Sequence, residues 1–376
     1  MPSPQELREH CAARLSAATA QARQLTAFIG FDGFVDDIIH LVDTRRDAQH
    51  FDRIPTIAKL AERLAAAAGK STNIELVSQR VKLGGNGPIM ANALAQFGLG
   101  VTYLGALGWP ARHPVFDDFA KRADVHSIAT PGMTDAFEFE DGKILFGKTV
   151  QLGDVNWANI QERYGREKFA HKLFNSHLVG FVNWTMLPYM SDIWEAVQKE
   201  LGAPPQGTRR TLFVDLADPA KRTPEDILRA LKLITNFQEH FDVILGLNEK
   251  EAWAVAGVIG HNAGGSTPED LCAAARAIQK HAPVKTVVVH PVSYAFACTG
   301  GECAMAEGPF VGKPLITTGA GDHFNAGFCL GKLLGLEDQL AVLTGVSTSG
   351  FYVRNARSPT IADLAGLLRN WPSKDM

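Results

Sequence analysis

The sequence predicts an α/β protein whose doubly wound, mainly parallel β-sheet is flanked by helices and accompanied by a small β-sheet lid. Two observations lead to this prediction. After residue 25, short apolar runs rich in β-branched residues alternate with amphipathic stretches, which is typical of strands buried between helices. The segments 36–46 and 134–151 depart from this alternation, so we assign them to the lid. We interpret the chain of 376 residues as one domain, 1–376.

The expected elements of the main sheet follow one another in strand–helix order. Six apolar runs are short enough to be buried parallel strands: Leu25–Gly30, Val101–Leu107, His177–Val182, Leu212–Leu216, Asp242–Leu247 and Thr286–His290. Five helical stretches separate them: Ile89–Phe97, Met190–Leu201, Pro224–His240, Lys250–Val258 and Pro268–His281. Crossovers between parallel strands of one sheet are almost always right-handed, so we expect that hand here.

The lid is indicated by segments that resemble half-buried antiparallel strands. Ala136–Val150 alternates apolar and polar residues around Asp141-Gly142, and Asp-Gly is a strong signal for a β-hairpin. Such strands do not belong in a parallel core, so we expect them to lie over one face as a lid. An edge hairpin without a role is the alternative. The long connection 50–81 contains a helix at Ile57–Ala68.

Composition argues against two classes of partner. The chain has 37 basic and 40 acidic residues and a formal net charge of −3, so a strongly basic surface for nucleic acid is not expected. No apolar run approaches the roughly 20 residues that a membrane-spanning helix needs. The polar, alanine-rich N-terminus does not resemble a signal peptide, so we expect a cytoplasmic protein.

The number and spacing of the cysteines predict neither disulfide bonds nor a zinc site. There are five, an odd number: Cys11, Cys272, Cys298, Cys303 and Cys329. No C-x-x-C pair occurs, so their spacing suggests neither a disulfide framework nor a zinc knuckle. We therefore expect reduced thiols in a cytoplasm, with a nucleophilic cysteine as the alternative.

The stretch Ile316–Phe328, I-T-T-G-A-G-D-H-F-N-A-G-F, carries the strongest functional signal. Gly319, Ala320 and Gly321 lack bulk, so successive backbone N–H groups can point at one anion where a helix begins. The helix dipole favours negative charge at the same place. Asp322 stands where the turn enters the helix, and its carboxylate can accept the proton of an attacking hydroxyl. The alternative is that Asp322 only caps the helix.

Two further turns follow predicted strands or precede predicted helices. Gly84–Gly87 (G-G-N-G) precedes a helix, and glycines let the backbone approach a ligand closely. Gly30–Asp37 (G-F-D-G-F-V-D-D) follows the first strand, and ligands of open α/β sheets bind at such strand ends. A carboxylate there, from Asp36 or Asp32, can clamp two sugar hydroxyls. A plain strand–helix turn and a turn with solvated acids are the alternatives.

These motifs together resemble a known family. The T-T-G-A-G-D-x-F-x-A-G-F pattern, the Gly84–Gly87 turn and Asn248–Glu251 (N-E-K-E) match, in order and rough spacing, the ribokinase-like (PfkB) carbohydrate kinases over about residues 26–370. The resemblance implies a kinase that transfers the γ-phosphoryl group of ATP to a hydroxyl of a sugar or sugar-like molecule. It implies that the turn 319–321 forms the anion hole and that Asp322 is the catalytic base.

The resemblance also implies roles for the other candidate residues. The sugar would be held by an aspartate after the first strand and by the glycine turn, which gives Asp36, Asp32, Gly84, Gly85 and Asn86. The nucleotide would be bound by Asn248, Thr317, Thr318, Gly319 and Gly321. Glu251 would act on Mg²⁺ through water, because Mg²⁺ keeps several of its waters. For N-E-K-E alone, an ordinary helix capping box is the alternative.

Three positions depart from the family pattern. The family usually has an aspartate at Ile316 that helps to hold a monovalent cation, so potassium activation stays open. The family also usually has an asparagine at the position of Ile89, next to the glycine turn that contacts the sugar in the family. Thr-x-Gly, which contacts the nucleotide in many relatives, is replaced by His290-Pro291-Val292.

Two nucleotide donors are compatible with these motifs. The motifs at Gly30–Asp36 and Gly84–Asn92, and the long connection 50–81, resemble the ADP-dependent sugar kinases of the same superfamily. The C-terminal motif resembles the ATP-dependent members, and residues near it normally shape the nucleotide pocket, so we expect ATP. The same fold could also carry a nucleoside kinase or a non-catalytic protein that binds a sugar or a nucleotide.

The expected partners are a small sugar or polyol and a nucleotide, without nucleic acid or membrane. A homodimer through the lid is a further option, because lid strands of this family often pair between subunits and exposed strand edges can pair. Five basic residues can hold a substrate phosphate or be simple solvated charges: Arg45, Arg46, Lys148, Lys221 and Arg222.

Overall fold

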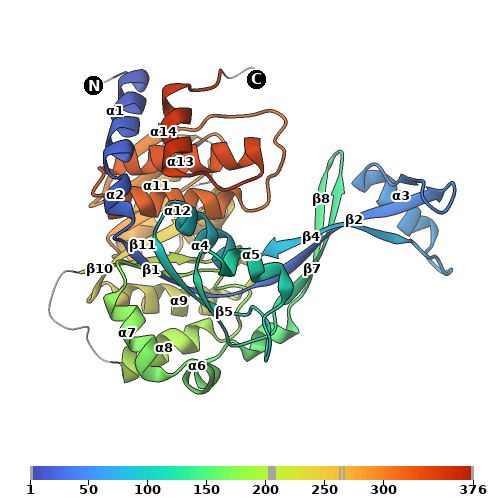
Figure 1. The fold of residues 1–376 in the computed structure, drawn as a ribbon, viewed down its shortest axis with the longest axis horizontal. Coiled ribbons are helices and arrows are strands. Elements are labelled where there is room, and N and C mark those ends of the chain that lie inside the picture. Colours follow the sequence, from blue (N-terminus) through green and yellow to red (C-terminus); the bar gives the residue numbers. More distant parts are fainter. Residues whose placement is uncertain (1–2, 202–208, 262–263, 266, 374–376) are drawn as a thin grey trace.

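The computed structural model of the protein describes residues 3–201, 209–261, 264–265 and 267–373 (Figure 1). Its main body is a nine-stranded sheet with helices on both faces. A second, smaller sheet projects from one side of that body. The predicted α/β fold with a separate small sheet is therefore confirmed.

The main sheet has the strand order β14-β13-β12-β11-β10-β9-β1-β5-β6. Its strands are β1 (Thr26–Phe31), β5 (Gly100–Gly105), β6 (Asp124–Ser127), β9 (Leu178–Phe181), β10 (Arg210–Asp215), β11 (Phe241–Leu247), β12 (Thr286–Val289), β13 (Tyr294–Thr299) and β14 (Glu302–Glu307). Neighbours from β6 to β12 are parallel, whereas β13 and β14 run antiparallel at one edge. The six predicted strands are β1, β5, β9, β10, β11 and β12, and all six form.

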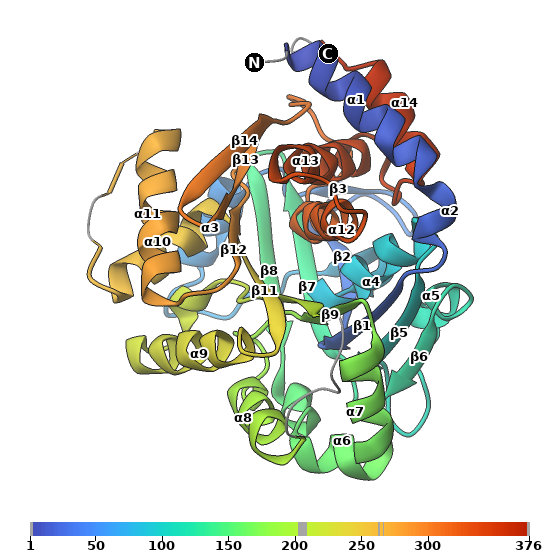
Figure 2. The same ribbon diagram turned by 90° about the vertical axis from the view of Figure 1, so that its left-hand side faces the viewer.

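The inner strands of the main sheet contribute to two cores, because successive side chains point to opposite faces of a sheet. In β10, Leu212 and Val214 belong to one core and Phe213 belongs to the other. The strands read as continuous apolar runs for this reason. Figure 2 shows the two groups of helices that cover these faces.

The helices divide between the two faces. The first core packs against α6 (Trp157–Arg163), α7 (Arg166–Asn175), α8 (Met190–Glu200), α9 (Pro224–Phe237), α10 (Glu249–Val258) and α11 (Pro268–His281). The second packs against α1 (Pro4–Ala17), α2 (Thr19–Ala22), α4 (Asn86–Gln96), α5 (Asp117–Ala120), α12 (Ala320–Leu333), α13 (Asp338–Asn355) and α14 (Ile361–Arg369). Among the described residues, no helix is both long enough and apolar enough to cross a bilayer.

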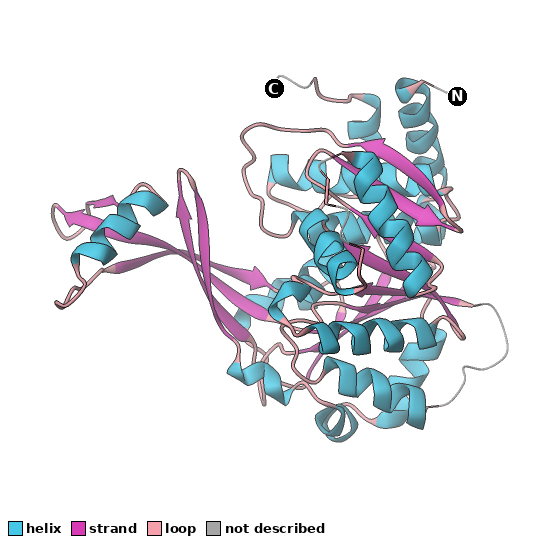
Figure 3. Ribbon diagram, turned by 180° about the vertical axis from the view of Figure 1, so that it is seen from behind, coloured by secondary structure: helices cyan, strands magenta, loops and turns pink. Residues whose placement is uncertain are grey.

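The small sheet, called the lid below, projects away from the body (Figures 1 and 3). It consists of β2 (Phe34–Arg45), β3 (Phe51–Arg53), β4 (Leu76–Gly84), β7 (Gly132–Phe139) and β8 (Gly142–Lys148), with α3 (Ile57–Ala66) near its tip. β3 and β4 pair antiparallel with β2, β7 pairs parallel with β2, and β8 pairs antiparallel with β7. The lid has a small core of its own, formed by Ile39, Leu41, Ile54, Leu60 and Phe137.

The sequence analysis did not predict strand β4 or the β13–β14 hairpin. β4 is largely exposed, and its sequence L-V-S-Q-R-V-K-L-G has no regular apolar face. It is held by backbone pairing with β2, which leaves little trace in the sequence. The β13–β14 hairpin is rich in alanine and cysteine, which are small residues without a strong strand signal.

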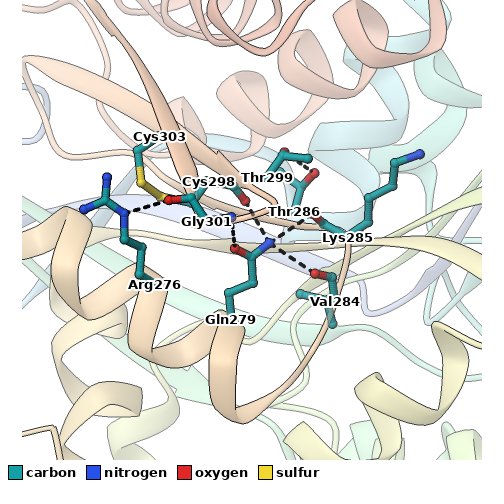
Figure 4. The surroundings of a disulfide bond; sticks show 9 residues. All are labelled: Arg276, Gln279, Val284, Lys285, Thr286, Cys298, Thr299, Gly301 and Cys303. Carbon is teal, nitrogen blue, oxygen red and sulfur yellow. Dashed lines mark hydrogen bonds between the residues drawn. A yellow bond between two sulfur atoms is a disulfide. The ribbon is translucent and has the colours of Figure 1, made fainter.

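The expectation that all cysteines are reduced thiols is wrong for one pair. Cys298 of β13 and Cys303 of β14 lie directly opposite each other and form a disulfide bond (Figure 4). The hairpin turn between them brings the two residues together, with their Cα atoms 4.1 Å apart. Gln279 of α11 donates to the carbonyl of Cys298 at 3.1 Å and so ties the hairpin to the body. Cys11, Cys272 and Cys329 are free.

Leu60→Ala is expected to loosen the lid without unfolding the body. Leu60 is 6% exposed and packs in the lid core, which is separate from the two cores of the main sheet. Loss of a packed leucine side chain costs roughly 2–5 kcal/mol, and here it lowers the free energy of local opening. Hydrogen exchange of the lid amides should become faster while that of β9 and β10 stays unchanged.

Leu64→Ala is the matched control, because Leu64 lies on the same helix but is 52% exposed. Equal acceleration of lid exchange in both variants would contradict a separate lid core.

Candidate active site

A cavity of about 610 Å³ opens where the carboxyl ends of the parallel strands meet the lid. β1, β9, β10, β11 and β12 all end at this edge of the sheet because they run parallel. The lid strands form the opposite wall. The charged side chains of the wall are Asp36, Lys82, Lys143, Asp215, Asp218, Lys221, Glu251 and Asp322. Residues that are far apart in the sequence are therefore brought together here.

The turn before α12 presents backbone N–H groups to this cavity. Gly319 has a φ of +92°, a left-handed conformation that glycine adopts without steric cost. The N–H groups of Ala320 and His323 donate to carbonyls within the turn. Those of Gly321 and Asp322 have no protein acceptor in the described part of the chain. Two free N–H groups at a helix N-terminus can bind an anion.

Asp322 lies in the first turn of α12 and is 8% exposed at the cavity wall. Burial raises the pKa of its carboxyl well above the ordinary value, and the nearby charges of Asp215 and Asp32 raise it further. A hydrogen bond with the Asn86 side chain opposes this rise in pKa. A carboxylate with a raised pKa accepts a proton more readily than an exposed aspartate does.

Asp36 lies on β2 between Lys82 of β4 and Thr134 of β7. It is 7% exposed at the cavity wall, and Lys82 Nζ lies 3.9 Å from its Oδ2. Burial raises the pKa of Asp36, and the positive charge of Lys82 opposes that rise. A Cβ atom on Gly84 would lie 2.4 Å from the Asp36 carboxylate, so the glycine makes room for the acid.

Asp32 lies beneath the turn Gly84–Gly87 rather than in the cavity wall. Its carboxylate accepts hydrogen bonds from the N–H of Asn86 at 2.9 Å, the N–H of Gly87 at 2.8 Å and Asn183 Nδ2 at 2.7 Å. Burial raises the pKa of Asp32 to about 6, and these hydrogen bonds oppose the rise. Asp32 therefore holds in place the turn that carries Asn86, which does line the cavity.

The Asn248–Glu251 motif forms a capping box at the start of α10. Asn248 Oδ1 accepts the N–H of Glu251 at 2.9 Å, and Glu251 Oε2 accepts the N–H of Asn248 at 2.8 Å. Glu251 Oε1 accepts the N–H of Asp218 at 2.8 Å, which ties the exit of β10 to α10. Burial raises the pKa of Glu251. Both motif residues also line the cavity, so the capping box leaves them at the site.

Sequence reasoning missed four charged residues of the wall, Lys82, Lys143, Asp215 and Asp218. Lys143 Nζ donates to Thr318 Oγ1 at 2.7 Å and to Thr317 Oγ1 at 3.2 Å, across the gap between the lid and the glycine turn. No local signal marks a hairpin lysine as part of a distant site. Asp215 Oδ2 accepts from Asn325 Nδ2 at 2.9 Å, while its buried Oδ1 has no partner among the described residues. A carboxylate at the exit of a predicted parallel strand was the available signal for Asp215.

The five basic residues that were candidates for a substrate phosphate lie in three different places. Arg45, Arg46 and Lys148 form ion pairs on the lid with Glu75, Asp52 and Asp135. Arg222 lies over the Trp184 ring and donates to backbone carbonyls of Trp184, Thr185 and Leu187. Of the five, Lys221 is the one in the cavity wall, where it pairs with Asp218.

A second cavity, of about 760 Å³, adjoins the first. The two share Asn248, His290, Thr317 and Gly321 in their walls. The rest of the second wall is mainly apolar and includes Trp253, Val292, Pro309, Phe310, Val311 and Val346. A charged cavity and an apolar cavity that meet at the glycine turn suit a small polar molecule and a larger planar group, with an anion between them.

Solved structures of sugar kinases are similar to this chain over most of its length. Arabidopsis thaliana ribokinase complexed with ribose and ATP has a TM-score of 0.62 at 17% identity, and the match covers 92% of this chain and 98% of that chain. Phosphofructokinase-2 from Escherichia coli in complex with fructose-6-phosphate has a TM-score of 0.61 at 14% identity, with 92% and 98% covered. At these identities the likeness establishes the ribokinase fold.

The family is established by sequence. The family model for prokaryotic ketohexokinase matches residues 5–371. The ketohexokinase of Haloferax volcanii is 28% identical over 337 residues, which are 89% of this chain and 88% of that protein. The protein is thus a carbohydrate kinase of the ribokinase-like class. Within that class, the chain belongs to the prokaryotic ketohexokinase family.

Asp32→Ala is expected to lower the free energy of unfolding by roughly 3 kcal/mol, because it leaves buried donors without an acceptor. Asp32→Asn keeps one oxygen acceptor without a buried charge, so it should be milder. Urea unfolding of both variants measures the difference. A loss below about 1 kcal/mol for the alanine variant would contradict the anchoring role of Asp32.

Proposed function

We propose that this chain transfers the γ-phosphoryl group of ATP to a hydroxyl of a ketohexose. Family membership and the name of the Haloferax volcanii relative support the acceptor class. The observation that carries the proposal is the meeting of a charged cavity and an apolar cavity at the Gly321–Asp322 turn. Phosphoryl transfer requires an acceptor hydroxyl, a base and the terminal phosphate to lie at one point.

The sugar would lie in the charged cavity under the lid. The two oxygens of Asp36 can accept from two neighbouring hydroxyls, and Lys82 beside it can donate. Gly84 and Gly85 let the sugar approach the backbone, and the Asn86 amide can contact both the sugar and Asp322. Asp32 would act through the turn rather than by touching the sugar.

The nucleotide would lie with its base in the apolar cavity and its phosphates toward the glycine turn. Asn248 and Thr317 line both cavities, and Thr318 lines the charged one. Of the turn 319–321 that the sequence predicted as the anion hole, the N–H of Ala320 already donates to the Thr317 carbonyl, so the terminal phosphate would be bound by the N–H groups of Gly321 and Asp322. The resemblance of the C-terminal motif Ile316–Phe328 to the ATP-dependent members of the family supports ATP rather than ADP as the donor.

Magnesium would be held near Glu251 and Asp215 through its waters. Both Glu251 oxygens already accept backbone N–H groups, whereas Asp215 Oδ1 is buried without a partner in the described residues. Those residues contain no group of three His, Cys, Asp or Glu side chains that could hold a metal ion. Such oxygen donors fit Mg²⁺, which would neutralise phosphate charge there. Activity with and without potassium tests whether the chain depends on a monovalent cation.

Asp322 would take the proton of the acceptor hydroxyl as the oxygen attacks the γ-phosphorus. The new oxygen–phosphorus bond forms while the bond to the β,γ-bridging oxygen breaks, and the nucleoside diphosphate leaves. The free N–H groups of Gly321 and Asp322 and the Lys143 ammonium group face the charge on the transferring group. The lid would exclude water, which limits hydrolysis of the donor.

We also propose a domain organisation, an oligomeric state and a cellular location for this chain. The chain 1–376 would act as one kinase domain, with lid segments near 36–46 and 134–151. A homodimer would form through the lid, where β8 is an edge strand and Phe146 is 55% exposed. The protein would work in the cytoplasm. Sedimentation equilibrium tests the homodimer, and cell fractionation tests the cytoplasmic location.

A coupled assay with Mg²⁺ tests the proposed function. ATP and ADP are paired with fructose and other ketohexoses, aldohexoses, fructose 6-phosphate and nucleosides. Transfer from ATP to a ketohexose in preference to the other acceptors is expected. Preference for ADP or for a nucleoside would assign the chain a different activity within its fold. Nucleotide binding without transfer to any acceptor would favour a binding protein.

Asp322→Asn is expected to lower kcat by about 10²–10⁴, the usual contribution of a general base, while nucleotide and sugar affinities change little. Because burial and neighbouring carboxylates raise the pKa of Asp322, the wild-type kcat/KM should fall with decreasing pH well above the range of an ordinary aspartate. Asp192→Asn, an exposed first-turn acid of α8, is the matched control. Near-normal turnover of Asp322→Asn would remove Asp322 from the role.

Lys143→Met is expected to lower kcat about 10- to 100-fold, which corresponds to the loss of one charge-assisted hydrogen bond in the transition state. Steady-state kinetics measures the effect. Lys148→Met on the same hairpin is the control, because Lys148 pairs with Asp135 outside the cavity wall. Equal kinetics of the two variants would contradict a role for Lys143 at the phosphate.

A further inference from the structure

A line of hydrogen-bonded side chains leads from the surface to the turn before α12. His323 is 2% exposed, and its Nδ1 lies 2.7 Å from the carbonyl oxygen of Gly319. Its Nε2 lies 2.9 Å from Ser358 Oγ. Ser358 Oγ accepts from Asn92 Nδ2 at 3.3 Å, and Asn92 Oδ1 accepts from the guanidinium of Arg122 at 2.7 Å. The line joins four segments that are distant in the sequence.

The chemistry of these groups fixes the direction of each hydrogen bond. The carbonyl of Gly319 can only accept, so Nδ1 of a neutral His323 carries the proton and Nε2 accepts from the Ser358 hydroxyl. Arg122 can only donate, so it orients the Asn92 amide with its Nδ2 toward Ser358. Burial lowers the pKa of His323 to about 4, so the ring is neutral near pH 7. Every donor therefore points toward the turn.

Tyr352 of α13 makes a second tie to the same turn. Its ring stacks on His323 with centroids 3.6 Å apart, and its hydroxyl donates to the carbonyl of Thr318 at 2.9 Å. A Cβ on Gly319 would lie 3.3 Å from Tyr352 Oη and 3.2 Å from Ile89, so the turn is closely enclosed. Two consecutive carbonyls, those of Thr318 and Gly319, are thus held by side chains.

Holding a carbonyl also fixes the N–H group of its peptide unit, because the peptide bond is planar. The Thr318 carbonyl shares its peptide unit with the N–H of Gly319, and the Gly319 carbonyl shares its unit with the N–H of Ala320. These two held units lead directly into the two units that carry the free N–H groups of Gly321 and Asp322, so they fix the course of the backbone into that part of the turn. Small errors in the aim of such donors are costly in transition-state stabilisation. We propose that His323, held by Ser358 and Tyr352, is a positioning residue that aims these N–H groups at the phosphoryl group in transit. This inference rests on the proposed function.

The test separates the donor function of His323 from its packing. His323→Phe keeps a ring for Tyr352 but removes the donor to Gly319. It is expected to lower kcat about tenfold, equivalent to about 1.4 kcal/mol, while KM for the sugar and the unfolding temperature change little. His323→Asn places an amide N–H close to the position of Nδ1, so it should recover most of kcat.

Ser358→Ala is the second variant and carries the test if His323→Phe does not fold. It keeps the ring but frees its Nε2, so kcat should fall about threefold with KM unchanged. Wild-type kcat in His323→Phe, or equal losses in the Phe and Asn variants together with a lower unfolding temperature, would overturn the positioning role. Absence of transfer by the wild-type chain would instead refute the proposed function, and this inference with it.

Discussion

Asp32 is enclosed where β1, the lid and α4 meet, and its carboxylate accepts hydrogen bonds from Asn86, Gly87 and Asn183. A buried carboxylate is costly unless its oxygens are satisfied. The end of lid strand β4 and the exit of β9 must therefore assemble around it together. The same contacts bring the Asn86 side chain to Asp322, so the wall formed by the Gly84–Gly87 turn is built in fixed relation to the proposed base.

The cavity concentrates carboxylates beyond what stability alone favours. Burial raises the pKa of Asp215, and the charge of Glu251 raises it further; Asp322 is affected in the same way by burial and by Asp215. Such crowding costs folding free energy, and it is typical of functional sites. The lid lysines Lys82 and Lys143 offset part of the negative charge. Under the proposed function, Mg²⁺ would offset more of it when the nucleotide binds.

The sequence predicts those parts that have local or periodic signals. Strand–helix alternation predicts the parallel sheet, Asp141-Gly142 predicts the lid hairpin, and the glycine turn locates Asp322. β4 escapes prediction because backbone pairing holds it and its side chains are exposed. The contact of Lys143 with Thr318 depends on how the lid reaches over the body, and the Cys298–Cys303 bridge depends on strand register. Such pairings are properties of the tertiary structure.

The most direct measurement is a crystal structure with Mg²⁺, ADP, aluminium fluoride and a ketohexose, in which the fluoroaluminate stands in for the phosphoryl group in transit. We expect it within hydrogen-bond distance of the N–H groups of Gly321 and Asp322, with the attacking hydroxyl against the Asp322 carboxylate. A fluoroaluminate bound away from this turn, or a hydroxyl that faces another base, would contradict the assignment of the glycine turn and Asp322 as the point of transfer.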